Sequence, residues 1–318
     1  MRRTTVMGAL IGVGVLSIAV AGFQAPAGQG RDGQAGADGR GRGDGRGRGP
    51  AAPPVLDIMK VKDNLWMITG NGGNTAVFQT ANGLVLVDTK NPGGGQLILD
   101  KIRTVTDNPI TTIINTHTHA DHTGGNEFFG ASVEYVAHEN TKANMEKMDN
   151  FKGDKSVFMP KKTYKDKLTL LSGKDEIDLY YFGPAHTNGD SFVVFKELRV
   201  MHAGDAFANK GTPFIDAANG GSGLEYGKTV GKAAAVRNVD FIITGHGTVM
   251  TPGDAKEYAD FNNDFAAWGQ AQMKAGKTVE AAAAEYKVPD WYRARGFTVG
   301  GRGAGANLQV IYNELGKK

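Results

Sequence analysis

The sequence predicts an α/β protein built as a four-layer αββα sandwich, with two mixed β-sheets face to face, helices on both outer surfaces, and a helical C-terminal region. Short runs of apolar and β-branched residues, each of strand length, recur between residues 55 and 250. Segments with a helical spacing of apolar residues lie between them. Several strand-like runs end in motifs rich in His, Asp and Gly, which predicts a site at one edge of the sheets.

The first half of this domain is predicted to open with an antiparallel meander. Ala81-Asn82-Gly83 separates two of its strands and has Asn-Gly at its centre, a typical hairpin signal. Over residues 96–105, apolar side chains recur close to the helical period. The last strand of this half runs directly into the polar segment 116–122. The predicted strands are 55–61, 65–69, 75–79, 83–88 and 111–115.

The second half repeats this pattern and ends in helices. Its predicted elements are the strands 168–171, 177–182, 191–195, 198–202 and 241–243 and a helix over 225–236. Further helices are predicted over 254–275, 279–286 and 302–315, the last after the glycine-rich loop 296–305. We therefore assign residues 55–252 to the sandwich domain and residues 253–318 to a helical C-terminal extension.

Residues 1–21 are predicted to be a signal peptide. Arg2 and Arg3 precede an apolar segment, and Ala19-Val20-Ala21 matches an A-x-A cleavage pattern. The apolar run is short for a membrane span of about 20 residues. An uncleaved N-terminal anchor is the alternative, and it would be the only membrane attachment that we expect. In both cases a periplasmic or secreted location is expected. Residues 22–54 are rich in Gly, Arg and Asp and are predicted to be a disordered linker.

Composition excludes several classes of protein. The net charge is +3, but the first fifty residues contain seven Arg and three Asp, so the rest of the chain carries −1. A nearly neutral domain is not expected to bind nucleic acid. The absence of cysteine excludes disulfides, thiol catalysis, iron–sulfur clusters and thiolate metal sites. Nitrogen and oxygen must therefore hold any bound metal.

Seven His and Asp side chains near predicted strand ends form a pattern typical of a metal site. His117 and His119 are two residues apart, so in an extended segment they point to the same side. Imidazole and carboxylate suit zinc, and also manganese or iron. Seven ligand-type residues are too many for one zinc ion, which takes about four ligands, so two ions are expected. The candidate ligands are His117, His119 and His186 for one ion, Asp121, His122 and His246 for the other, and Asp205 as a bridge.

This pattern predicts hydrolytic chemistry. Two zinc ions about 3.5–4 Å apart would share a water molecule, lower its pKa toward neutrality and generate hydroxide. The hydroxide would attack a carbonyl or phosphoryl centre whose oxygen is polarised by a metal. Asp121 is the predicted catalytic residue, because its carboxylate is expected both to hold a metal and to orient the nucleophile. Unrelated surface histidines and capping aspartates are the alternative, but so many ligand-type residues together favour a metal site.

The segment His117-Thr118-His119-Ala120-Asp121-His122, followed by His186, Asp205 and His246, resembles the motifs of the metallo-β-lactamase-fold hydrolases. The resemblance covers about residues 55–252. It implies an αββα sandwich with the metals at the edge between the two sheets. It also implies that Asp88, at the end of a predicted strand, is buried near the metals and organises their site without ligating them.

The resemblance leaves the reaction open. We expect an exported dinuclear zinc hydrolase that cleaves an ester, thioester, lactone or amide bond of a small-molecule substrate. One alternative is a β-lactamase with an all-His/Asp metal set, against which the bridging Asp205 argues. Another is a mononuclear Fe(II) persulfide dioxygenase. The complete ligand set disfavours a non-catalytic binding module. The sequence indicates no particular oligomeric state.

Four further features have two interpretations each. The glycine-rich loop 70–74 is interpreted as a mobile flap over the metals or as a simple connection. The loop 211–221 either lines the pocket or caps the following helix. His138 is expected at a helix N-terminus rather than beside the metals, whereas His202 either supports the site or is structural.

Overall fold

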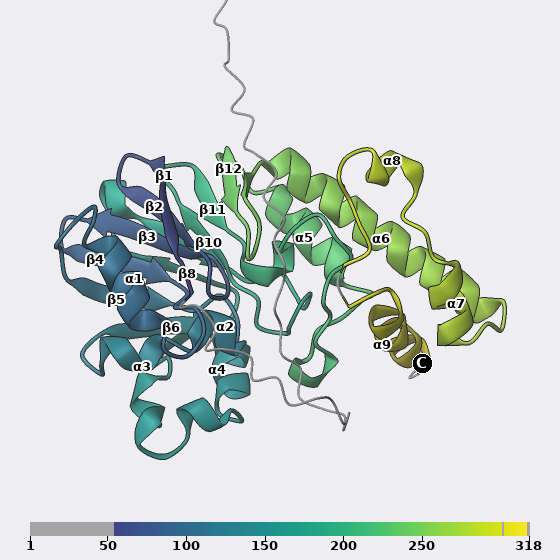
Figure 1. The fold of residues 1–318 in the computed structure, drawn as a ribbon, viewed down its shortest axis with the longest axis horizontal. Coiled ribbons are helices and arrows are strands. Elements are labelled where there is room, and N and C mark those ends of the chain that lie inside the picture. The colour runs from purple at the N-terminus through teal and green to yellow at the C-terminus, as the bar shows by residue number, and fades with distance from the viewer. Residues whose placement is uncertain (1–53, 301, 317–318) are drawn as a thin grey trace, which may run out of the picture. The chain divides into compact units, whose positions relative to one another are not determined.

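The computed structural model describes residues 54–300 and 302–316. The predicted signal peptide and all but the last residue of the predicted linker lie outside the described residues. Within them, two mixed β-sheets lie face to face between layers of helices (Figure 1). The prediction of an αββα sandwich is therefore confirmed.

Within the described residues, the first sheet has seven strands in sequential order. Its first four strands are antiparallel neighbours, and the strands from β4 to β7 then pair in parallel. Thr80 pairs with Gly83 across the predicted hairpin. The strands are β1 (Asp57–Lys62), β2 (Leu65–Thr69), β3 (Thr75–Thr80), β4 (Gly83–Val87), β5 (Ile110–Ile114), β6 (Glu134–His138) and β7 (Lys162–Tyr164).

The second sheet has six strands in the described part of the chain, in the order β13-β12-β11-β10-β9-β8. Only β11 and β12 are parallel among its pairs, and the other neighbours are antiparallel. Its strands are β8 (Lys167–Leu170), β9 (Ile177–Tyr180), β10 (Phe192–Phe195), β11 (Val200–His202), β12 (Phe241–Ile243) and β13 (Val249–Met250).

Alternation along the strands explains the layers. In β4, Leu84 packs toward α1 (Gly94–Ile102), whereas Val85 packs between the sheets. In β10, Val193 packs between the sheets, whereas Phe192 packs toward the helices on the other outer face. Because successive side chains of a strand point to opposite faces, a strand covered on both sides carries apolar residues at nearly every position.

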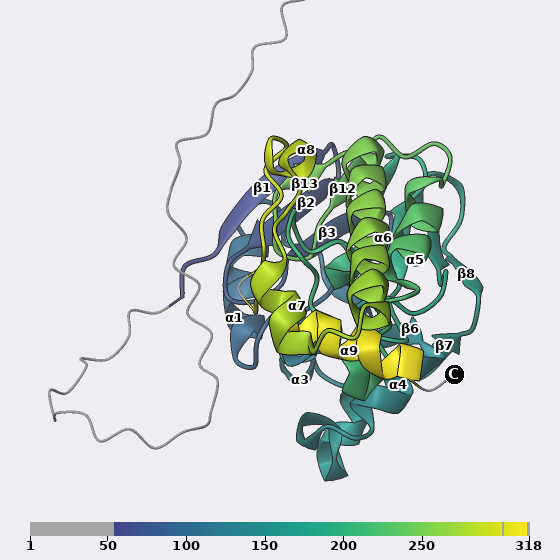
Figure 2. The same ribbon diagram turned by 90° about the vertical axis from the view of Figure 1, so that its right-hand side faces the viewer.

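The long helix α6 (Pro252–Lys274) and the shorter helix α5 (Tyr226–Ala234) cover the outer face of the second sheet. The two helices run side by side in both views (Figures 1 and 2). A capping box at Thr251 and Asp254, with Pro252 in the first turn, starts α6 two residues earlier than predicted. The other helices are α2 (Ala120–Thr123), α3 (Asn126–Phe129), α4 (Glu139–Met145), α7 (Val279–Glu285), α8 (Asp290–Arg293) and α9 (Gly305–Gly316). None of the helices within the described ranges is both long and apolar enough to cross a membrane.

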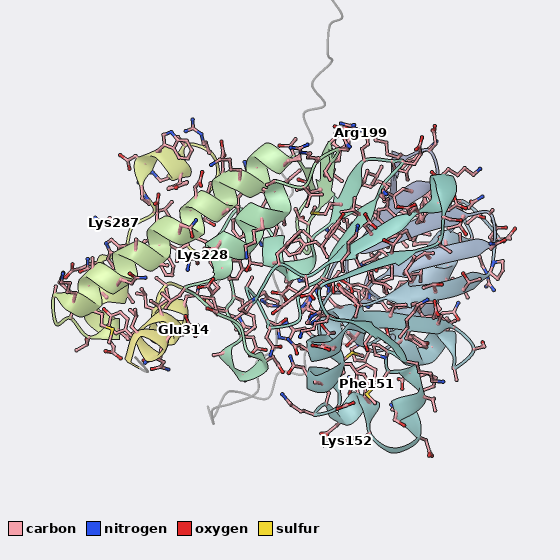
Figure 3. The ribbon with its side chains drawn as sticks, turned by 180° about the vertical axis from the view of Figure 1, so that it is seen from behind. Phe151, Lys152, Arg199, Lys228, Lys287 and Glu314 are labelled. Atoms are coloured by element: carbon pink, nitrogen blue, oxygen red, sulfur yellow. The ribbon has the colours of Figure 1, made fainter. Side chains whose placement is uncertain are left out.

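The last helix is tied back to the sandwich. α9 packs with α7 against the end of α6 in a small apolar cluster. Its Glu314 carboxylate accepts hydrogen bonds from the backbone N–H groups of Gly223 and Leu224, each 3.1 Å long (Figure 3). These contacts hold α9 beside the segment that leads into α5. α9 starts three residues later than predicted, since Gly303 before it has a φ of +71° and is not helical.

Parallel pairing gathers several strand ends at one edge of the sandwich. β4 and β5 are parallel neighbours in the first sheet, and β11 and β12 are parallel neighbours in the second. Each of these four strands leads directly into a polar segment. The segments are residues 88–91, 115–122, 203–205 and 244–247, and they contain most of the predicted site residues.

Candidate metal centre

All seven candidate ligands converge at this edge. Four of them lie around the end of β5 and on the short helix α2, and the others come from loops next to the second sheet. Their polar atoms form two groups, each with its atoms within 4.8 Å of one another. One group contains His117, His119, His186 and Asp205, and the other contains Asp121, His122 and His246. The structure thus brings the predicted residues together in the predicted sets, and their roles as ligands stay a prediction.

Asp205, a member of the first group, also contacts the second. Its Oδ1 is 3.2 Å from His122 Nε2, and its Oδ2 is 3.3 Å from His246 Nε2 and 3.7 Å from His186 Nε2. The Oδ2 atom of Asp121 also approaches His246 Nε2, at 3.2 Å. This central position is the one that a bridging carboxylate needs.

The outward ring nitrogens of four histidines have hydrogen-bond acceptors. His122 Nδ1 donates to Asp88 Oδ2 at 2.7 Å. His117 Nδ1 lies 3.0 Å from the hydroxyl of Thr116, which itself donates to Asp88 Oδ2 at 2.7 Å. Asp88 also accepts from the Thr116 backbone N–H and is fully buried. Asp88 therefore supports two imidazoles from behind, as the resemblance implied.

The other two supports come from the loop 211–216, which we call the wall loop. His119 Nε2 donates to Asp216 Oδ2 at 2.7 Å, and His186 Nδ1 donates to the carbonyl of Phe214 at 2.7 Å. The Phe214 ring also stacks on the imidazole of His119, with centroids 5.7 Å apart. Of the two interpretations of this loop, the structure favours the one in which it lines the site.

The donor atoms that face inward fit a cation. When the outward nitrogens carry the protons, the inward nitrogens present lone pairs to one another. His119 Nδ1 and His186 Nε2 are then only 2.8 Å apart, and His122 Nε2 and His246 Nε2 are 3.3 Å apart. His117 Nε2 and Asp205 Oδ1 are buried without a hydrogen-bond partner in the described structure. Buried lone pairs are unfavourable unless a partner satisfies them, and a divalent metal held by nitrogen and oxygen would do so.

The electrostatics agree with this fit. Burial lowers the pKa of His117 well below its ordinary value and that of His186 to about 4, so both imidazoles stay neutral. Burial also lowers the pKa of His246, but the carboxylates of Asp205 and Asp121 outweigh this and raise it to about 9. Neutral imidazoles thus stand beside carboxylates that favour positive charge at the centre.

Two glycines allow the chain to approach the centre closely. A Cβ on Gly73 would collide with the imidazole of His122, and a Cβ on Gly245 would collide with Oδ1 of Asp205. Only a residue without a side chain leaves room at these positions.

The loop 70–74, which we call the strap loop, is held from three sides. Gly73 N–H donates to the Asp121 carbonyl at 3.0 Å. The Asn74 side chain donates to the carbonyls of Thr244 and Gly247, both at 2.8 Å. Buried Lys90 donates from Nζ to two carbonyls of this region, Ile68 at 2.9 Å and Gly73 at 2.7 Å. The structure therefore corrects the flap interpretation, because these bonds fix the loop against the site.

The two remaining histidines are structural. His138 caps the N-terminus of α4 by accepting from Asn140 N–H, and its Nε2 donates to the Lys165 carbonyl at 2.7 Å. This confirms its predicted place at a helix start. His202 accepts from Gly204 N–H and donates to the Asn74 carbonyl at 3.1 Å. It thereby links the end of β11 to the strap loop.

Sequence reasoning missed three supporting residues. Thr116, Lys90 and Asp216 lie outside the ligand motifs, and nothing in the spacing singles them out. Chemistry could have pointed to such residues, because a histidine that binds metal through one ring nitrogen needs a hydrogen-bond acceptor for the other.

The family model of the metallo-beta-lactamase superfamily matches residues 68–261, more than half of the chain. Two curated relatives are similar over about half of this chain. The 2,4-dinitroanisole O-demethylase subunit alpha of Nocardioides sp. (strain JS1661) is 27% identical over 155 residues, which are 48% of this chain and 46% of that protein. The metallo-beta-lactamase type 2 of Elizabethkingia meningoseptica is 28% identical over 162 residues, 48% of this chain and 62% of that protein. The chain thus spans about half of the first relative and less than two thirds of the second.

Solved structures share the fold. The stereoselective inverting sec-alkylsulfatase from Pseudomonas sp. aligns with a TM-score of 0.68 and 16% identity, over 82% of this chain and 50% of that chain. A metallo-beta-lactamase from Pontibacter korlensis aligns with a TM-score of 0.57 and 18% identity, over 66% of this chain and 100% of that chain. At these identities the likeness concerns the fold alone.

Proposed function

Because this chain belongs to the metallo-beta-lactamase superfamily, we propose that it is a dinuclear zinc hydrolase that cleaves an ester, thioester, lactone or amide bond of a small molecule. One observation carries the proposal. Asp205 lies between two groups of His and Asp side chains whose inward atoms include buried lone pairs without a partner. That arrangement has the donor types and the number of donors that two zinc ions take.

The residues would divide the work as follows. His117, His119 and His186 would hold one ion, Asp121, His122 and His246 the other, and Asp205 both. When bound, two zinc ions supply a water molecule of lowered pKa and polarise the scissile carbonyl. Asp121 is 28% exposed and His246 33% exposed, whereas Asp205 is 12% exposed, so the incoming substrate meets Asp121 and His246 first. We assign Asp121 Oδ2 to orient the attacking water and to accept its proton.

A β-lactamase activity is the second candidate. The Elizabethkingia relative, named a metallo-beta-lactamase type 2, supports it at 28% identity. The bridging position of Asp205 distinguishes the two candidates, because the resemblance places a bridging aspartate in other hydrolases of this fold. Hydrolysis of a chromogenic cephalosporin with a kcat/KM in the ordinary enzyme range, above about 10⁴ M⁻¹s⁻¹, would favour the β-lactamase.

Metal content and turnover test the proposal together. We expect about two zinc per chain in purified residues 22–318, measured by mass spectrometry, and hydrolysis of at least one ester, lactone, thioester or β-lactam. Asp121→Ala should lower kcat/KM at least about 100-fold while changing the thermal midpoint little. Asp63→Ala is the matched control, because Asp63 is an exposed carboxylate in the β1–β2 turn. About one iron per chain with oxygen uptake would instead support the persulfide dioxygenase.

We also propose that the protein is exported to the periplasm or secreted. Arg2, Arg3 and the A-x-A pattern at residues 19–21 support this. Sequencing the N-terminus of the mature protein checks it, because cleavage by a signal peptidase predicts a start at residue 22. A start at residue 1 with recovery in the membrane fraction would indicate an uncleaved anchor.

A further inference from the structure

The chain returns to the metal centre near its C-terminal helix. After α8, Thr298 pairs with the start of the wall loop through two backbone hydrogen bonds, to Lys210 at 3.1 Å and from Thr212 at 3.0 Å. Gly300 N–H then donates to the hydroxyl of Thr212 at 2.8 Å. This part of the chain is thus laid along the loop that supports His119 and His186.

A second anchor follows a few residues later. On α9, the side chain of Asn307 donates to the carbonyl of Pro213 at 2.5 Å and accepts from the N–H of Ile215 at 3.3 Å. Asn307 is buried. Gly300 and Asn307 are therefore both bonded to the wall loop, and Arg302 lies between them in the sequence.

Arg302 stacks on the ring of Phe214. Its guanidinium carbon is 3.5 Å from the ring centroid. The same ring stacks on the imidazole of His119, with a centroid distance of 5.7 Å. The distance from the guanidinium carbon to the centre of the His119 ring is therefore at most the sum of these two distances, with Phe214 in contact with both groups.

Stacking leaves the donors of the guanidinium available. A cation–π contact uses the face of the group, whereas its N–H bonds lie in the plane and point outward. In the described part of the chain, the arginines that form ion pairs are Arg199, Arg293 and Arg295, not Arg302. Asp216, the acidic residue of the wall loop, accepts from the side chains of His119 and Asn219. Arg302 is exposed, so a ligand can reach its donors.

We propose that Arg302 is a specificity-determining residue, whose guanidinium binds a monoanionic oxyanion group of the substrate through paired N–H donors. This proposal rests on the proposed hydrolase function and adds the class of substrate to it, namely a compound that carries a carboxylate or sulfonate besides the scissile bond. A single cation suits a monoanion. Lys210, the neighbouring cation, is already paired with Asp254 at 2.7 Å. Guanidinium binds such oxyanions through two parallel N–H···O⁻ hydrogen bonds. A neutral substrate cannot form these charged hydrogen bonds.

Two matched esters test this proposal. Mono-4-nitrophenyl succinate carries a carboxylate, and 4-nitrophenyl butyrate is neutral and of similar length. For Arg302→Gln we expect the KM of the succinate ester to rise about tenfold with kcat little changed, and the kcat/KM of the butyrate ester to stay within about twofold. For Arg302→Lys the KM of the succinate ester should lie between those of wild type and Arg302→Gln, because lysine keeps the positive charge but lacks the paired N–H donors of guanidinium. Arg237→Gln, an exposed arginine after α5, is the control for charge and should alter neither ester.

Each outcome separates the inference from the function on which it rests. Equal losses for both esters, or no loss for either, would mean that Arg302 only covers Phe214, and the hydrolase proposal would stand. If the zinc-loaded wild type hydrolyses neither ester, the hydrolase proposal fails for esters, and calorimetric binding decides the inference. We then expect 4-phenylbutyrate to bind Arg302→Gln about tenfold more weakly than wild type, with 4-phenylbutanamide unchanged. A titration with 3-phenylpropane-1-sulfonate shows whether sulfonates share the site. No difference between wild type and Arg302→Gln for either anion overturns the inference.

Discussion

The strap loop (70–74) and the wall loop (211–216) flank the same metal centre but are held in different ways. The strap loop bonds to backbone atoms of both sheet edges and to the buried ammonium of Lys90. The wall loop is held by Thr298 and Gly300, which follow α8, and by Asn307 in the first turn of α9. The comparison suggests that the strap side keeps the metal geometry constant, whereas the wall side can change with the substrate, since loops on a rigid scaffold tolerate variation.

The largest effect is expected on the strap side. Gly73→Val would push a side chain into the imidazole of His122 and displace it. Because a shift of about 1 Å in a catalytic group can cost about 100-fold in rate, we expect at least that loss in kcat/KM and a lower zinc content. Steady-state kinetics and metal analysis of the purified variant measure both.

Gly231→Ala is the matched control. A Cβ at this position in α5 would meet only the Cβ of Ala259, at 3.8 Å, so it fits without strain. We expect unchanged activity and a stability gain of up to about 1 kcal/mol, because alanine is the better helix former. Full activity in Gly73→Val would show that the strap loop can move to accommodate the side chain. The strap loop would then be no more rigid than the wall loop.

The next effect concerns stability and pH. Lys90→Met leaves the carbonyls of Ile68 and Gly73 without their donor, which should lower the free energy of unfolding by about 2 kcal/mol near pH 9. Burial lowers the pKa of Lys90 to about 7, against the opposing charges of Asp88 and Asp121. Because this pKa is lower in the folded protein, the stability linked to it is complete above the ordinary value of 10.5 and is lost as the pH falls through 7.

Urea denaturation of wild type and Lys90→Met across this range checks the sign. The advantage of the wild type should shrink steadily between about pH 9 and pH 6, since the methionine variant has no ammonium to desolvate. An advantage that grows toward low pH would contradict a buried ammonium with a lowered pKa.

The smallest effect is expected on the wall side. Asp216→Asn keeps an acceptor for His119 Nε2 but removes its charge. Loss of such an outer partner typically weakens metal binding 10- to 100-fold, and we expect the lower end because the amide still accepts a hydrogen bond. Competition with a fluorescent zinc chelator measures the change. A loss larger than that of Gly73→Val would reverse the proposed roles of the two loops.

Much of the site could be predicted because its ligands belong to short motifs at strand ends. His117, His119, Asp121 and His122 follow strand β5, which the short apolar run at its end located to within one residue at each end. Asp88 was implied by the resemblance, and the structure buries it behind two imidazoles. The local sequence pattern was sufficient to predict those site residues that directly follow a strand.

The rest depends on contacts between distant segments. Arg302 meets Phe214 only because the chain returns along the wall loop, and no spacing in the sequence encodes that return. The strap loop was interpreted as a flap because glycine usually indicates flexibility. Its Gly73 instead provides room for His122, which is a packing requirement that sequence alone does not distinguish from mobility. The predicted strands do not include β6, β7 or β13, of which β7 and β13 have only three and two residues, too few to show alternation.

The anchoring of segment 298–307 to the wall loop has an evolutionary consequence. The described residues of this segment supply none of the seven candidate metal ligands, yet its Arg302 stacks on Phe214, which in turn stacks on His119. A lineage could therefore exchange this stretch, by recombination between residues 293 and 298, and acquire a different substrate while inheriting the metal chemistry intact. Close homologues should then diverge faster here than in the strap loop, and chimaeras joined at this point should bind metal as the parent proteins do.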